Sequence, residues 1–150
     1  MKIPIKFGLL IAAGVMAWVL IAHQVVANPA SPVHSLVGPI FFNVLQFVMI
    51  YLGLKETERE QGDRLTFKEG LKTGAFISFV YALTVSLFFG VVVAVVGTRW
   101  LEHEPDFGRV PTTTLIAKAF VLLFVGAMFL GLIYSTVISF FLAKRQSDSR

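Results

Sequence analysis

The sequence has no cysteine and few charges. Without cysteine there is no disulfide, no thiolate metal site and no thiol redox chemistry. Charged residues make up 15% of the 150 residues, against about 25% in a typical soluble domain. A glycine-rich phosphate loop, a nucleophile motif and a His-Glu-x-x-His zinc motif are also missing. These gaps argue against an enzyme, and we expect no catalytic residue, no cofactor and no bound metal.

Hydrophobic residues are abundant, at 56% of the chain, and the charges fall in short clusters between long apolar runs. A helix of about 20 apolar residues crosses the roughly 30 Å of hydrocarbon in a bilayer. Because backbone groups in lipid must pair with one another, a helix is favoured even in valine-rich runs. The sequence therefore predicts an all-α integral membrane protein. We expect one domain, 1–150, forming a four-helix antiparallel bundle with spans at about 7–27, 36–54, 73–98 and 114–143.

Lysine and arginine are divided unevenly between the two sides of this bundle. Ten lie on the side of both termini and the central connector, and three lie on the other side. Because lysine and arginine accumulate on the cytoplasmic side, we expect both termini in the cytoplasm. The same bias explains the net charge of +4 without a nucleic-acid partner. The ten are Lys2, Lys6, Lys55, Arg59, Arg64, Lys68, Lys72, Lys144, Arg145 and Arg150; the three are Arg99, Arg109 and Lys118.

The first span allows a second interpretation. A basic start, an apolar centre and a small-residue site ending at Ala27 are also the parts of a signal peptide. The length of the apolar run favours a retained span, and cleavage would leave three spans in the same orientation. The short pattern K-x-G-x-x-I occurs twice, at Lys6–Ile11 and at Lys72–Ile77. This repeat leaves open the interpretation that the chain is a duplication of one helical hairpin.

The polar connector between the second and third spans carries the clearest local signals. Helix-forming residues continue the second helix through Lys55–Gln61, and Gly62 suits a left-handed helix end. Thr66 and Glu69 have the spacing of a capping box, in which each side chain bonds the other residue's backbone amide. We therefore expect the third helix to begin near Phe67.

Two further patterns concern contacts of this connector. Glu56 and Arg59 have the spacing of a weak ion pair within a helix. Gly70 and Gly74 form a G-x-x-x-G pair, which allows close helix approach. At a membrane surface we give that pair little weight, because two glycines also loosen the start of a helix. We expect other small residues to supply the packing faces: Gly8, Ala12, Gly90, Ala94, Gly126 and Gly131.

The order of residues in the connector resembles a known family. Gly53-Leu54-Lys55 is followed by Arg59, Gly62, Leu65-Thr66-Phe67, Gly70 and Gly74. This order is similar to that of the domain of unknown function family numbered 4199, although Gly70 stands where that family more often has alanine. The resemblance implies a small four-span protein of the bacterial inner (plasma) membrane. It covers the whole chain in layout and Gly53–Gly74 in detail, and it brings no activity with it.

Asn43 and Gln46 are the most unusual residues inside an expected span. They are three apart and so share one face of the second helix. Amides in lipid need hydrogen-bond partners, so we expect a polar seam of Asn43, Gln46 and Tyr81. The seam either joins helices, which is the favoured interpretation, or lines a path for a small solute. Other available partners are Ser78, Thr84, Tyr134, Ser135 and Ser139.

The connector is also a candidate docking hairpin. Its charges can clamp an anionic lipid headgroup or a partner, although mixed charges at helix ends are commonly only solvated. The docking residues are Lys55, Arg59, Gly62, Thr66, Phe67 and Glu69, with Glu56 and Lys72 as further members of the charged clamp. Three histidines are weaker candidates for a metal or pH-sensitive site: His23 and His34 near one interface, and His103 in an acidic loop that Pro105 keeps from forming a regular helix.

These observations favour a non-enzymatic integral membrane protein. Its expected partners are the lipid bilayer and either other membrane proteins or a second copy of the chain. The alternative is an oligomeric small-solute channel or transporter with Asn43 and Gln46 facing the path, and a lipid-modifying enzyme is less favoured. No aspartate or glutamate lies in an expected span, whereas a proton-coupled exporter is expected to carry one.

Overall fold

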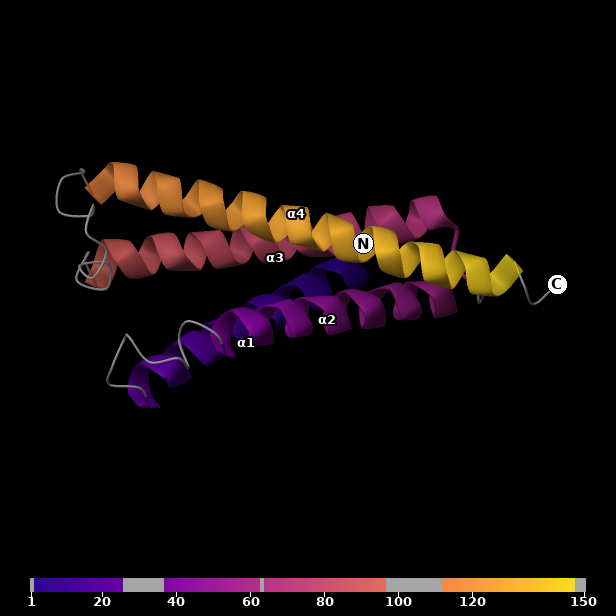
Figure 1. The fold of residues 1–150 in the computed structure, drawn as a ribbon, viewed down its shortest axis with the longest axis horizontal. Coiled ribbons are helices and arrows are strands. Elements are labelled where there is room, and N and C mark those ends of the chain that lie inside the picture. The colour runs from indigo at the N-terminus through magenta and orange to yellow at the C-terminus, as the bar shows by residue number, and fades with distance from the viewer. Residues whose placement is uncertain (1, 26–36, 63, 97–111, 148–150) are drawn as a thin grey trace.

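The computed structural model describes residues 2–25, 37–62, 64–96 and 112–147. These residues form four helices and no strand, which confirms the expected all-α class for the described ranges. The helices are α1 (Lys2–Val25), α2 (Gly38–Glu60), α3 (Phe67–Val96) and α4 (Thr112–Ser147), shown in Figure 1. Each is long and apolar enough to cross a membrane.

The helices extend beyond the expected spans at several ends. α1 begins at Lys2 rather than near residue 7, and α4 continues to Ser147 rather than ending near 143. α3 begins at Phe67, in the connector, as its capping signal predicts. Polar helix formers continue a helix beyond its apolar run, and this extension places charged residues at the helix ends. The expected connector at 28–35, with His34, lies outside the described residues, as do residues 99–111 of the connector expected at 99–114, with His103, and the side chain of His23. The last residues of that second connector, 112–114, belong to α4.

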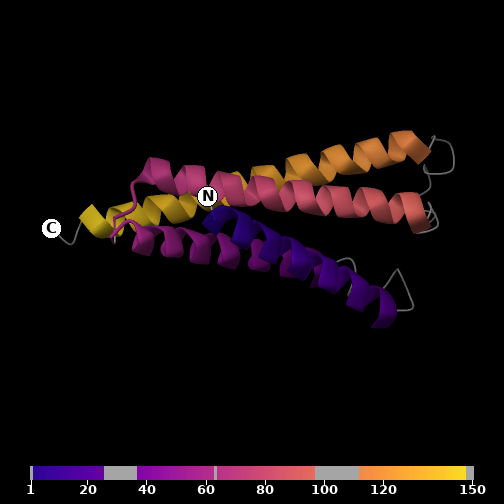
Figure 2. The same ribbon diagram turned by 180° about the vertical axis from the view of Figure 1, so that it is seen from behind.

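α3 and α4 make the most extensive contact, and they pack through small residues spaced four apart. A Cβ atom added to Gly70 would lie 2.5 Å from Ser139 Oγ, and one added to Gly74 would lie 2.6 Å from Ser135 Cβ. We call these positions the small-residue seam: Gly70 facing Ser139, Gly74 facing Ser135, and Ser78 facing Gly131. The numbers rise along α3 and fall along α4, so the two helices run in opposite directions, side by side in Figure 2.

The low weight given to Gly70 and Gly74 was wrong. Because α3 is already capped at Thr66, both glycines lie inside a formed helix rather than in a loosened end. α4 also extends far enough to cover both of them. Two of the expected packing residues behave differently: a Cβ atom added to Gly126 would meet no atom within 4 Å, and Ala94 is exposed.

α1 and α2 also pack side by side and run in opposite directions. Phe7 lies against Gly53, and further along the pair Trp18 stacks on Phe41 with ring centroids 4.8 Å apart. Gly8 lets α1 approach α3, because a Cβ there would lie 2.7 Å from Val80 Cβ. The core formed between these helices is fully buried and apolar. It includes Ile11, Val15, Ile50, Leu54, Leu65 and Ile77.

We expect Gly74→Ala to weaken the fold although alanine is the better helix former. The added methyl group meets Ser135, and overpacking of this kind costs about 1–3 kcal/mol. The helix propensity gained by replacing glycine with alanine is about 1 kcal/mol. The free energy of unfolding in detergent micelles, followed by circular dichroism during titration with a denaturing detergent, measures the balance.

Gly126→Ala is the matched control, because its new methyl group enters open space. We expect this variant to be as stable as the parent or slightly more stable. If Gly74→Ala proves as stable as Gly126→Ala, the close contact of α3 with α4 at Gly74 is not part of the fold.

Candidate functional site

The described residues between α2 and α3 include a helix end at Gly62 and a capped helix start at Thr66, as the sequence predicts. α2 ends at Glu60, and Gly62 has a φ of 72°, the left-handed conformation that favours glycine. The Thr66 amide donates to Glu69 Oε2 at 3.1 Å, and the Glu69 amide donates to Thr66 Oγ1 at 3.3 Å. The capping box and the start of α3 near Phe67 are therefore confirmed.

Glu69 has a structural role in this turn. Its carboxylate accepts the Thr66 hydroxyl at 2.7 Å as well as the Thr66 amide. Hydrogen bonds to a carboxylate favour the charged form, and those from the Thr66 side chain and backbone lower the pKa of Glu69. The group lies before Thr73, where we expect the membrane span to begin.

The charged residues of the candidate docking hairpin take separate positions. Glu56 pairs with Lys6 of α1, with Lys6 Nζ 2.9 and 3.0 Å from the two carboxylate oxygens. The expected Glu56–Arg59 pair is therefore replaced by a contact between helices. The Lys55 ammonium lies 5.8 Å from the centre of the Tyr51 ring. Arg59 and Phe67 are exposed, and docking through them remains a prediction.

Asn43 and Gln46 join α2 to α4. The Tyr134 hydroxyl donates to Asn43 Oδ1 at 2.7 Å, while Asn43 Nδ2 donates to the Pro39 carbonyl at 2.7 Å. Gln46 Nε2 donates to the Ala127 carbonyl at 3.0 Å, and the Gln46 side chain is buried. Both amides are therefore used in holding helices together.

Tyr81 takes no part in these bonds. It is buried in the apolar core, and its hydroxyl has no hydrogen-bond partner among the described residues. Tyr134 forms the hydrogen bond with Asn43 instead, and it is one of the other available partners named from the sequence. The sequence does not single out Tyr134, because the choice depends on how α2 and α4 are rotated about their axes.

Serines of the small-residue seam are mostly turned back onto their own helices. Ser78 Oγ donates to the Gly74 carbonyl at 2.8 Å, and Ser135 Oγ donates to the Gly131 carbonyl at 2.6 Å. Such bonds satisfy a hydroxyl in an apolar setting without a partner helix. Within the described ranges, no group of three or more His, Asp or Glu side chains is placed to hold a metal ion.

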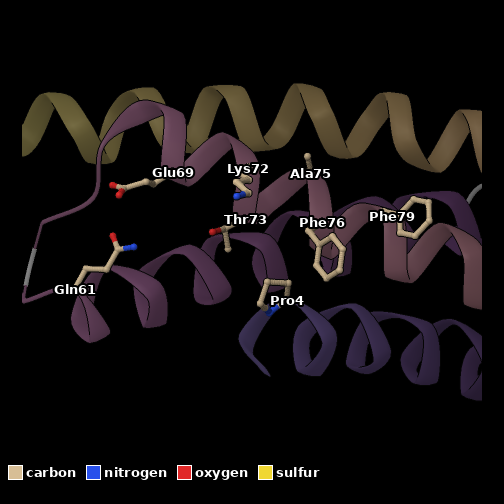
Figure 3. Close-up of a pocket in the computed structure, with 8 residues that line it drawn as sticks. All are labelled: Pro4, Gln61, Glu69, Lys72, Thr73, Ala75, Phe76 and Phe79. Atoms are coloured by element: carbon tan, nitrogen blue, oxygen red, sulfur yellow. The ribbon is translucent and has the colours of Figure 1, made fainter. Parts of the chain in front are cut away.

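A groove of about 720 Å³ lies where α1, the end of α2 and the start of α3 meet (Figure 3). Gln61, Glu69 and Lys72 line its polar end, and Phe76 and Phe79 line its apolar end. Pro4, Thr73 and Ala75 complete the lining. The sequence groups Lys72 and Glu69 with other connector charges, but it does not reveal the groove. Pro4 and Gln61 are far apart in the chain, and their position beside α3 depends on helix packing.

Four helices of this length and composition define the class: a multi-pass membrane protein. The family model described as protein of unknown function (DUF4199) matches residues 6–103. The chain therefore belongs to this family, as the residues of the connector indicate. The match includes most of α1 and all of α2 and α3, and it ends before α4. Comparisons with curated proteins and with solved structures find no match.

We expect the hydrogen bond between Asn43 and Tyr134 to be measurable as a coupling between the two residues. Asn43→Leu and Tyr134→Phe, singly and together, form a double-mutant cycle on the free energy of unfolding in detergent. Interhelical hydrogen bonds in membrane proteins average about 0.6 kcal/mol in such cycles, so the coupling is expected near that value.

The control cycle combines Asn43→Leu with Tyr51→Phe. Tyr51 is a half-buried tyrosine of α2 whose hydroxyl has no hydrogen-bond partner among the described residues. Its coupling to Asn43 should be near zero. Equal couplings in the two cycles would count against a specific bond to Tyr134.

Proposed function

We propose that this protein crosses the bacterial inner (plasma) membrane four times as an antiparallel bundle, with both termini in the cytoplasm. The excess of lysine and arginine on one side supports that orientation. The end of α2 and the start of α3 lie at the same end of the bundle as the last turns of α4 in Figure 1, as the proposal requires. In this position the protein acts without catalysis, by associating with other membrane proteins or with a second copy of itself.

The outer surface of α4 is the observation that carries the proposal of association. In the most apolar 18-residue stretch of α4, only 6% is buried inside the bundle. The corresponding stretches of the other three helices are 28–33% buried. Gly126 lies on this helix with open space beside it. A glycine inside a helix costs about 1 kcal/mol relative to alanine, and no contact within the described bundle accounts for it. Small residues are common where membrane helices approach one another closely, so a second helix fits here.

The solute-path alternative has less support. A path needs polar groups that face a passing solute, but Asn43 and Gln46 are bonded to Tyr134 and to the Ala127 carbonyl. The amide atoms that form these bonds are therefore already paired within the protein, so they are not available to water or a solute. Association through α4 needs no such group, because helix packing in lipid depends mainly on close contact.

The orientation is directly testable, because the chain has no cysteine of its own. We expect Arg64→Cys and Ser149→Cys to be shielded from a membrane-impermeant maleimide in intact cells, and Arg109→Cys to be labelled. Permeabilised cells should show labelling at all three positions, which controls for reactivity. Labelling of Arg64→Cys in intact cells, with Arg109→Cys shielded, would reverse the proposed orientation.

Association through α4 predicts where cross-links form. A photoreactive amino acid replacing Phe129, which is 65% exposed on α4, should give cross-links to protein when native membranes are illuminated. Val48 is the matched control, because it is 41% exposed on α2. We expect Val48 to give lipid adducts alone. Mass spectrometry of the products separates a second copy of this chain from a different protein.

Lipid adducts alone at Phe129, as at Val48, would contradict association through α4. Protein cross-links at both positions to the same extent would indicate contact by crowding rather than through one helix face.

A further inference from the structure

We propose that the groove between α1, α2 and α3 binds one anionic phospholipid of the cytoplasmic leaflet, with its phosphate beside Lys72 and an acyl chain against Phe76 and Phe79. The inference deepens the proposed function and rests on its membrane orientation. It concerns a different surface from the outer face of α4.

The lining of the groove changes from polar to apolar along α3. Gln61 and Lys72 lie at one end, and the rings of Phe76 and Phe79 follow toward the other end (Figure 3). From residue 72 to residue 79 a helix rises about 10 Å, enough to pass from the headgroup layer into hydrocarbon. A phospholipid has the same order of polar and apolar parts.

Lys72 is the cation available to a ligand in this groove. No described residue forms an ion pair or hydrogen bond with it. The nearby Lys6, by contrast, is neutralised by both carboxylate oxygens of Glu56. The acidic residue of the groove, Glu69, keeps its charge, but its carboxylate is held at the Thr66 hydroxyl and amide and forms no ion pair with Lys72. The free positive charge therefore favours an anionic headgroup over a zwitterionic one.

The position of Lys72 also agrees with a lipid rather than a soluble ligand. It is the last charged residue before an uncharged run that extends through Thr98. Phe76 and Phe79 are 37% and 41% exposed and lie within that run, at the depth of acyl chains. The two rings stack on each other with centroids 6.3 Å apart, and Phe79 also meets Phe124 of α4, but both rings keep exposed surface. A water-soluble anion would meet Lys72 and would leave that exposed surface uncovered. The dimensions suit part of a lipid, since ligand pockets of about 300–1,000 Å³ hold small molecules.

The full chain, purified in detergent, tests the proposal by native mass spectrometry with added phosphatidylglycerol or phosphatidylethanolamine. We expect the parent protein to retain phosphatidylglycerol in preference. Lys72→Gln should weaken phosphatidylglycerol binding about fivefold, the effect expected of one lysine beside an anionic surface. It should leave phosphatidylethanolamine almost unchanged. Phe76→Ala should weaken both lipids alike, because it removes contact with the chain rather than with the headgroup.

Two matched variants control for general effects. Lys68→Gln removes an exposed lysine one turn earlier in α3 that does not line the groove, and Phe140→Ala removes an exposed ring of α4. We expect both to bind phosphatidylglycerol as the parent does. Circular dichroism of every variant identifies any loss of fold, and a variant that has lost its fold is replaced by Lys72→Met or Phe79→Leu.

An equal loss with Lys68→Gln and Lys72→Gln would mean diffuse attraction to the charged end of the bundle and would overturn the proposal. Retention of no phosphatidylglycerol by the parent would overturn it as well. A photoreactive residue at Phe79 in native membranes should give lipid adducts, and capture of a protein there instead would assign the groove to a protein partner. Because the binding assay needs neither orientation nor a protein partner, its failure is distinguishable from failure of association through α4.

Discussion

The close approach of α3 and α4 is the contact on which the rest of the arrangement depends. In lipid, helices gain little from hydrophobic burial, so packing and hydrogen bonds between them decide the structure. Gly70, Gly74 and Gly131 remove the side chains that would hold α3 and α4 apart. Once α4 is fixed in this way, Tyr134 and the Ala127 carbonyl lie within reach of α2, and Asn43 and Gln46 bond them.

The capped start of α3 positions residues on two faces of that helix. Thr66 and Glu69 begin the helix early, which puts Gly70 and Gly74 in regular helix against α4. Lys72 and Phe76 lie away from that contact, because successive residues are about 100° apart around the axis. Phe79 lies at its edge, with its ring centroid 5.9 Å from that of Phe124 of α4. The turn that allows the tight helix contact therefore also places Lys72 and the two phenylalanines beside α1 and the end of α2.

Signals within a few residues of sequence predict where α2 ends and where α3 begins. They predict contacts between helices poorly. Gly62, Thr66 and Glu69 could be assigned from sequence, because each acts on backbone within a few residues. The bond from Tyr134 to Asn43 and the ion pair of Lys6 with Glu56 needed the structure. Helices that face lipid are apolar on most sides, so their hydrophobic pattern does not fix how they rotate against one another.

The surfaces assigned to a lipid and to a protein partner do not compete. No described residue of α4 lines the groove, whose walls come from α1, α2 and α3. The small-residue seam lies between α3 and α4. The outer surface of α4 is on the other side of that helix, away from the rest of the bundle. Since the amides of the interior are bonded within the protein, binding is expected at these outer surfaces and at the polar helix ends. A bound lipid at Lys72 would then stabilise the start of α3, and with it the contact that holds α4 in place.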